Sequence, residues 1–260
     1  MKQNLFLVFT MLTIILTGCR ERPVPNINIE QKGHAVASKI MAPGMGTIGL
    51  IENGNMTVYY IDENSEWWPD SLSRFDIPPG NEGLLALGAG TIGVVMKSKV
   101  HVYRLDNYNN WVTDPRYDFS VPKRHDRILA AKMPFEMGMI LIENGSYIDF
   151  YYFDEESGWL FDETATFKVP SGILQVVSMG DMTIAIADDK KLGLYYLHPE
   201  GEWHFVDDIV LQLPENYEAI IPWETGFIAI LSGNTLEFYK LDLQEGLWLH
   251  IEDMAFILNN

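Results

Sequence analysis

A motif built around one tyrosine recurs five times along this chain of 260 residues. Each copy has an apolar residue, a tyrosine, a variable residue and a second apolar residue, and an aspartate follows in four copies. The five tyrosines are Tyr59, Tyr103, Tyr151, Tyr195 and Tyr239, at steps of 44, 48, 44 and 44 residues. Spacing this regular indicates that one structural unit is repeated five times.

The second repeat shows what the unit contains. Three short runs, at 82–87, 91–96 and 100–105, are separated by turns rich in glycine, lysine and asparagine. A fourth segment opens at Trp111 and closes at 119–122. Four short strands joined by tight turns form an antiparallel meander, and units of about 40 to 50 residues of this kind are typical of β-propeller blades. We therefore predict an all-β fold, a five-bladed β-propeller of four-stranded antiparallel blades.

Two further landmarks mark the blades. A tryptophan follows the second turn of each repeat, and an apolar-x-apolar-Pro sequence closes four repeats, at 75–78, 119–122, 167–170 and 211–214. The fifth repeat ends in Phe256-Ile257-Leu258 without the proline. Because proline has no backbone N–H, it fits the end of an edge strand, which the outermost strand of a blade is. The predicted blades span about 34–78, 79–122, 123–170, 171–214 and 215–260.

The N-terminal residues have the pattern of an export signal. Lys2 precedes an apolar run at 5–16 that is too short to span a bilayer as a helix. The run ends in Leu16-Thr17-Gly18-Cys19, and Cys19 is the only cysteine. This ending resembles the lipobox of bacterial lipoproteins; an ordinary signal peptide with an incidental cysteine is the alternative.

The resemblance implies that residues 1–18 are a removed signal peptide, that Cys19 carries lipid, and that 19–33 form a linker. Acyl chains would then hold the protein at the cell envelope, and the anchor would be its only membrane contact. Arg20, where an aspartate would favour the inner membrane, points to the outer membrane, on its periplasmic or surface face. The fragment 26–29 resembles an additional outermost strand that could help to close the ring.

The charge of the chain limits its partners. The 36 acidic residues outnumber the 18 basic ones, which gives a net charge of −18. A phosphate backbone would be repelled, so nucleic acid is excluded as a partner. The acidic residues are scattered through predicted loops, which favours a solvated surface over a surface for cations or basic partners.

Two sets of side chains are candidates for ligand binding. The first set forms the ends of the predicted inner strands, around one mouth of the central channel: Met41, Leu87, Met133, Met179 and Trp223. These side chains could bind a ligand there, or they could fill the channel as core side chains. Trp223, followed by Glu224, breaks this series. The recurring tryptophans could stack on sugars, or could pack the outer turn of each blade; they are Trp67 or Trp68, Trp111, Trp159, Trp203 and Trp248. In the doublet, at least one tryptophan should be surplus to packing.

No catalytic motif is recognisable, and we predict no catalytic residue, metal or cofactor. A pair of carboxylates on inner strands could still serve a glycan hydrolase, although solvated loop charges are the simpler interpretation. The candidates are Glu82, Asp126, Glu136, Asp181, Glu218 and Glu224. The acidic turns at 62–65 and 154–158 could bind calcium, but they lack the spacing of a known calcium loop and fit hairpin turns better.

These observations support three hypotheses in order. The first is a non-catalytic, envelope-anchored binding or scaffolding propeller with an envelope protein as its partner. The second is a carbohydrate-binding propeller, with glycan held at tryptophans between blades. The third is a glycan hydrolase.

Overall fold

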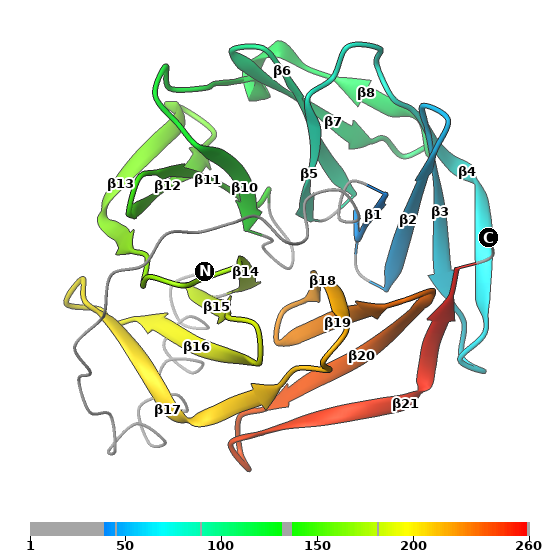
Figure 1. Cartoon of the computed structure of the whole chain (residues 1–260). Helices are drawn as coiled ribbons and strands as arrows, with labels where there is room; N and C mark the ends of the chain where they lie inside the picture. Colours follow the sequence, from blue (N-terminus) through cyan, green and yellow to red (C-terminus); the bar gives the residue numbers. More distant parts are fainter. Residues whose placement is uncertain (1–38, 45, 89, 132–136, 181, 259–260) are drawn as a thin grey trace.

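The computed structural model describes residues 39–44, 46–88, 90–131, 137–180 and 182–258 (Figure 1). The predicted signal peptide, Cys19, the linker and the fragment 26–29 lie outside the described residues. Five antiparallel sheets are arranged around a central axis, and within each sheet the strands pair in chain order. The prediction of a five-bladed propeller with four-stranded antiparallel blades is confirmed.

Each blade runs from an inner strand near the axis to an outer strand at the rim. The first blade contains β1 (Ile40–Met41), β2 (Thr47–Glu52), β3 (Asn55–Ile61) and β4 (Trp67–Asp76). The second contains β5 (Gly83–Gly88), β6 (Thr91–Met96), β7 (Lys99–Leu105), β8 (Trp111–Thr113) and β9 (Phe119–Ser120). The third contains β10 (Arg127–Ala131), β11 (Met139–Asn144), β12 (Tyr147–Asp154) and β13 (Gly158–Lys168). The fourth contains β14 (Gln175–Gly180), β15 (Thr183–Ala187), β16 (Lys191–Leu197) and β17 (Trp203–Gln212). The fifth contains β18 (Tyr217–Glu224), β19 (Phe227–Ser232), β20 (Thr235–Asp242) and β21 (Leu247–Ile257).

The outer strand of every blade is bent at the same place. In four blades the pairing between third and outer strands shifts register, for example between Met56 and Val58. In the second blade the outer strand is split into β8 and β9 by the 3-10 turn Pro115–Tyr117, and both pieces pair with β7. Pro115 cannot donate a backbone hydrogen bond, which explains why this bend becomes a full break.

The apolar core lies between the blades. One cluster joins Met56 and Phe75 of the first blade to Ile92 and Val94 of the second, and the other clusters likewise combine residues of neighbouring blades. Burying a large apolar side chain contributes about 1.5–3 kcal/mol, so a blade without its neighbours would leave this stabilisation unrealised. This is why both faces of the third strands carry apolar residues.

The meander gives the ring two distinct faces. Successive turns of an antiparallel meander lie alternately on the two faces of the ring. The hairpins between third and outer strands therefore all lie on one face, which we call the outer-hairpin face. The opposite face, the linker face, carries the segments that lead from each outer strand to the next inner strand. Among the described residues, no helix has the length and apolar character that crossing a membrane requires.

Candidate functional site

Four of the recurring tryptophans bind the backbone of the preceding blade. The indole Nε1 of Trp111 donates to the carbonyl oxygen of Ser73 at 3.1 Å. The equivalent bonds join Trp67 to Met254 (3.3 Å), Trp159 to Tyr117 (2.8 Å) and Trp203 to Ala165 (3.1 Å). Every acceptor lies in the bent part of an outer strand. These four residues, the latch tryptophans, therefore connect one blade to the next.

Aromatic packing accompanies each latch. Phe75 at the end of the first blade contacts the rings of Tyr103 and Trp111 of the second, with centroids 5.0 and 5.3 Å apart. The same trio recurs at the next two junctions and at the junction of the fifth and first blades, where Phe256 contacts Tyr59 and Trp67. The repeated tyrosine of the sequence motif is thus one member of a contact between blades.

The junction of the fourth and fifth blades differs. Leu211 stands where the other blades have phenylalanine, and it packs with Trp248 and Tyr239 in one apolar cluster. The buried Nε1 of Trp248 has no hydrogen-bond partner among the residues that the structure describes. This junction therefore lacks both the latch bond and the aromatic trio.

Trp223 and Glu224 connect the ends of the ring. Trp223 is 3% exposed, and its Nε1 donates to the carbonyl oxygen of Thr47 at 3.1 Å. The Oε1 atom of Glu224 accepts a hydrogen bond from the backbone N–H of Gly46 at 2.6 Å. The ring of Trp223 also packs on Phe238. Both residues thus join the fifth blade to the first.

The other candidates for the channel mouth are buried as well. Met41, Leu87 and Met179 are 6%, 0% and 2% exposed, and Met133 lies outside the described residues. The carbonyl oxygens of Leu87 and Met179 accept hydrogen bonds from backbone N–H groups in loops of the following blades. Met41, Leu87 and Met179 each belong to an apolar cluster that joins two neighbouring blades.

The described candidate carboxylates lie at two different ends of the inner strands. Asp126 and Glu218 lie at the starts of inner strands and accept hydrogen bonds from the backbone N–H of Gly145 (2.6 Å) and Gly233 (3.2 Å). Glu82 is exposed at the same end of its strand, whereas Glu224 lies at the far end of β18. At about 3.3 Å per residue, Glu218 and Glu224 are about 20 Å apart. Glycosidase carboxyl pairs lie about 5–9.5 Å apart. Glu136 and Asp181 lie outside the described residues.

The acidic turns use their carboxylates locally. The Oδ1 atom of Asp62 accepts the N–H groups of Glu66 and Asn64, each at 2.9 Å, and these bonds hold the pKa of Asp62 below its ordinary value. Asp154 accepts from Ser157 and Glu156 in the same manner, with the pKa lowered for the same reason. Within the described ranges, no three His, Cys, Asp or Glu side chains are grouped to hold a metal ion.

Sequence reasoning missed one buried ion pair. The Nε atom of Arg127 on β10 donates to Oε2 of Glu143 on β11, and the two side chains are only 11% and 6% exposed. Their Cα atoms are direct partners in the sheet. The sequence signal is one basic residue and one acidic residue, each in an otherwise apolar strand, at positions that pair when the two strands form a hairpin.

The doublet divides its two tryptophans between two roles. Successive side chains of a strand point to opposite faces, so the ring of Trp67 enters the junction while that of Trp68 points away from it. Trp68 is 48% exposed and lies directly opposite Tyr60, which is 45% exposed. Its Nε1 donates to Oδ2 of Asp62 at 3.1 Å. We call Tyr60, Asp62 and Trp68 the rim patch.

The rim patch lies on an acidic face. The five hairpin loops between third and outer strands contain eleven Asp and Glu residues and no Lys or Arg, at 62–66, 106–110, 154–158, 198–202 and 242–246. In the other blades the cross-strand pair that matches Tyr60 and Trp68 is different, and includes Arg104 with Val112 and Lys240 with Leu249. Among the described blades, only the first therefore exposes two aromatic rings at this place.

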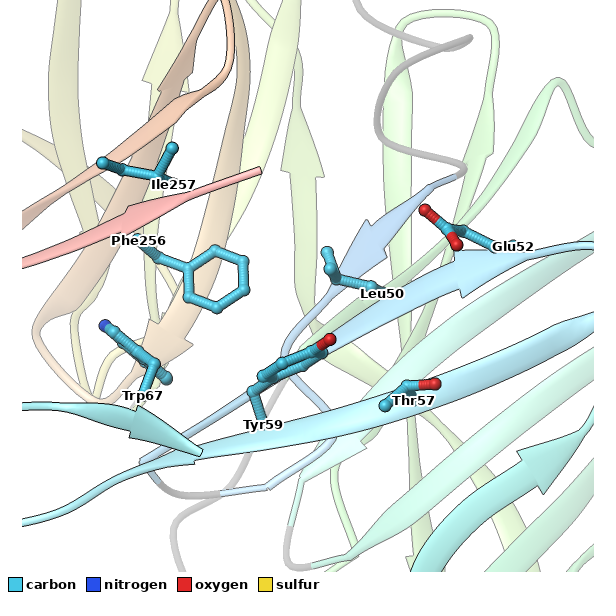
Figure 2. A pocket seen from close by; sticks show the side chains of 7 residues that line it. All are labelled: Leu50, Glu52, Thr57, Tyr59, Trp67, Phe256 and Ile257. Carbon is cyan, nitrogen blue, oxygen red and sulfur yellow. The ribbon is translucent and has the colours of Figure 1, made fainter. Parts of the chain in front are cut away.

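A crevice lies at the seam between the fifth and first blades (Figure 2). Its volume is about 350 Å³, and its lining residues are Leu50, Glu52, Thr57, Tyr59, Trp67, Phe256 and Ile257. Figure 2 shows Phe256 and Ile257 on one side, and Leu50, Thr57 and Tyr59 on the other. The wall is mixed: aromatic and aliphatic side chains lie beside the carboxylate of Glu52 and the hydroxyls of Thr57 and Tyr59.

Comparison with solved structures finds distant similarity. A protein from Lactobacillus plantarum is 11% identical, with a TM-score of 0.42 over 79% of this chain and 66% of that one, so this chain spans just under two thirds of its length. A functionally unknown protein from Desulfotomaculum acetoxidans is 11% identical, with a TM-score of 0.43 over 90% and 73% of the two chains. Kluyveromyces lactis Hsv2 is 11% identical, with a TM-score of 0.40 over 83% and 84%. No protein-family model matches the sequence. No curated protein matches it either.

Proposed function

We propose that this protein is a non-catalytic binding propeller, held at the cell envelope by lipid on Cys19, whose rim patch engages an envelope protein. The observation that carries the proposal is the half-exposed pair Tyr60 and Trp68 beside Asp62. The latch tryptophans and Trp223 hydrogen-bond to neighbouring blades, and Trp248 packs against an apolar cluster, whereas Trp68 is 48% exposed, which supports it as the tryptophan that binds a partner.

The chemistry of the rim patch suits a protein surface that carries lysine or arginine. Tyrosine and tryptophan are the residues that most often dominate binding energy at protein interfaces. The acidic loops around the patch attract a positively charged partner and raise its rate of association, with an effect that salt screens. The partner is therefore expected to present basic groups around an apolar centre.

Photo-crosslinking in intact cells tests this proposal. A benzophenone amino acid replaces Trp68 in one variant and Phe161, which is 43% exposed on the third blade, in a matched control. We expect one discrete adduct from position 68, none from position 161, and loss of the position-68 adduct when Asp62→Asn or Tyr60→Ala is added. Equal adducts from both positions, or no adduct from position 68, would overturn the proposal.

A glycan is the second candidate ligand. The exposed indole of Trp68 lies beside the carboxylate of Asp62, which also receives the side-chain amide of Asn64 at 3.5 Å. An aromatic face next to hydrogen-bonding groups is a suitable platform for a sugar. Glycan-array binding by the lipid-free protein that is lost in Trp68→Ala and kept in Phe161→Ala would favour this candidate over a protein partner.

The anchor has a separate test. In cells fed a radiolabelled fatty acid, the parent protein is expected to become labelled and Cys19→Ala is not. Equal labelling of Cys19→Ala and the parent protein would contradict lipid attachment at this residue.

A further inference from the structure

Four of the five blade junctions are crossed by a connecting segment of constant length. Five residues, beginning with proline, lead from the closing sequence of one blade to the inner strand of the next, at 78–82, 122–126 and 170–174, and the equivalent residues 214–218 include the first two residues of β18. At three junctions the last of the five pairs with the second strand of its own blade, as when the N–H of Glu82 donates to the carbonyl oxygen of Val95 at 2.8 Å. These segments lie on the linker face.

The fourth residue of the segment covers the junction in two of the four cases. Ile173 is 8% exposed within an apolar cluster that includes Ile186 of the second strand, and Tyr217 packs on the cluster that contains Ile230. At the other two junctions the fourth residue, Asn81 or His125, is exposed and hydrogen-bonds to the carbonyl oxygen of the proline in its own segment. An apolar fourth residue therefore adds cover where two blades meet, and a polar one orders its segment.

At the seam, between the fifth and first blades, the residues that the structure describes include no such connection. One buried position shows the consequence. The second-strand residues Val94, Ile142, Ile186 and Ile230 are 0–4% exposed, whereas Leu50, at the same position in the first blade, is only partly buried and lines the seam crevice. The crevice thus lies where the other junctions have their covering segment.

The chain itself supplies a matching segment. The first repeat precedes the second by 44 residues, so residues 34–38 correspond to 78–82. Their sequence, His34-Ala35-Val36-Ala37-Ser38, contains three consecutive apolar residues and no Asp, Glu, Lys or Arg. An uncharged, mainly apolar segment can pack against Leu50, Tyr59, Trp67 and Phe256 of the crevice and adds no second charge beside the carboxylate of Glu52.

We propose that residues 34–38 cover the seam crevice as a fifth linker, supplied by the N-terminal arm instead of by a preceding blade. The inference is independent of the rim patch. It has a consequence for orientation, because β1, like the other inner strands, starts at the linker face. An anchor at Cys19 then joins the propeller at its linker face, whereas the rim patch lies on the opposite, outer-hairpin face.

Engineered disulfides test the placement directly. Cys19 is the only cysteine, so the lipid-free chain with Cys19→Ala accepts a defined pair without competing thiols. Val36→Cys is combined with Ile257→Cys, which is 62% exposed at the crevice. Val24→Cys with Ile257→Cys is the matched control on the same arm. We expect rapid oxidation of the 36–257 pair within one chain and slow oxidation of the 24–257 pair. Equal rates, or no 36–257 bond, would overturn the proposal.

Stability gives a second readout. Val36→Asp places a carboxylate against the apolar side chains of the crevice and near Glu52, and is expected to lower the urea midpoint, while Val24→Asp leaves it unchanged. If Val36→Asp and Val24→Asp have the same midpoint, the crevice is not covered by the arm. None of these measurements involves Trp68, so this proposal and the proposed function can fail separately.

Discussion

The indole Nε1 of Trp67 donates a hydrogen bond to the carbonyl oxygen of Met254, 3.3 Å away and 187 residues further along the chain. The same bond joins neighbouring blades at three junctions inside the chain, so the seam is held by a contact that the repeat already contains. Every described sheet is built from strands that are consecutive in sequence. Side-chain contacts, including those of Trp223 and Glu224, thus close the ring of described residues without an exchange of strands.

The hydrogen bond of a latch tryptophan should make a measurable contribution to the free energy of unfolding. Trp67→Phe removes the N–H donor and leaves the Met254 carbonyl oxygen without this bond, which we expect to lower the free energy of unfolding by about 1 kcal/mol more than Trp248→Phe does. The comparison is matched because both changes remove the same atoms, and Nε1 of Trp248 has no partner among the described residues. Urea denaturation at pH 7 measures both variants. An equal loss in the two would show that the bond contributes nothing net.

The aromatic trio at a blade junction should also contribute to the free energy of unfolding. Leucine is sterically possible at the closing position, since Leu211 occupies it in the fourth blade. Phe167→Leu removes two ring contacts, to Tyr195 and Trp203 at 5.2 Å each, and should cost about 2 kcal/mol. Phe161→Leu, at an exposed site of the same blade, should cost less than about 0.5 kcal/mol. Thermal or urea unfolding that ranks the two variants the other way would contradict this account of the junction.

One glycine is required where the second and third blades touch. A Cβ atom at Gly138 would lie 2.2 Å from the carbonyl oxygen of Ala131 and 2.4 Å from that of Leu87. Both obstacles are backbone, so Gly138→Ala must push the blades apart, and we expect a loss of about 3 kcal/mol or insoluble protein. The control, Gly83→Ala, meets nothing within 4 Å and should change stability by less than about 0.5 kcal/mol. Normal stability of Gly138→Ala would mean that this contact is absent in solution.

Stability should fall at alkaline pH. Burial, together with the nearby charges of Asp188 and Asp189, raises the pKa of Tyr217 to about 12. An unfolded tyrosine ionises near pH 10, so the folded state keeps a proton between about pH 10 and 12 that the unfolded state has lost. The stabilisation is complete below pH 10 and is lost as the pH rises through this window.

Burial raises the pKa in the same direction for four of the repeated tyrosines, Tyr103, Tyr151, Tyr195 and Tyr239. Urea midpoints measured from pH 8 to 11 should therefore decline. Tyr217→Phe should decline less steeply than the parent protein, although it loses the hydrogen bond from the Tyr217 hydroxyl to the carbonyl oxygen of Asp188. Tyr108→Phe, at a site that is 85% exposed, is the control and should follow the parent. Identical slopes for both variants would rule out Tyr217 as a source of the decline.

Periodicity made the fold accessible from sequence. The tyrosine steps set the number of blades, and the apolar character of both faces of a segment such as Val58-Tyr59-Tyr60-Ile61 indicated sheets packed between neighbours. The bend in each outer strand could not be predicted from the sequence, because it depends on the register between third and outer strands and not on a residue type. The break at Pro115 is an exception, since proline marks it directly.

The candidate site was accessible only in part. The Trp67 and Trp68 doublet predicted that one ring would be free of packing. Because both residues are tryptophan, the sequence does not show which ring packs at the junction. The direction of the strand and the position of the fifth blade decide that the ring of Trp67 does. Likewise, Glu218 and Glu224 are six residues apart in sequence, but the extended strand β18 places them at its two ends, toward opposite faces of the ring.

The repeated pattern of tyrosine, tryptophan and closing proline determined five blades and their order, because each pattern reports local strand and turn geometry. Tertiary structure alone decided what each tryptophan touches and where the seam crevice lies. Those outcomes depend on contacts between residues as far apart as Trp67 and Met254, which meet only when the ring is closed.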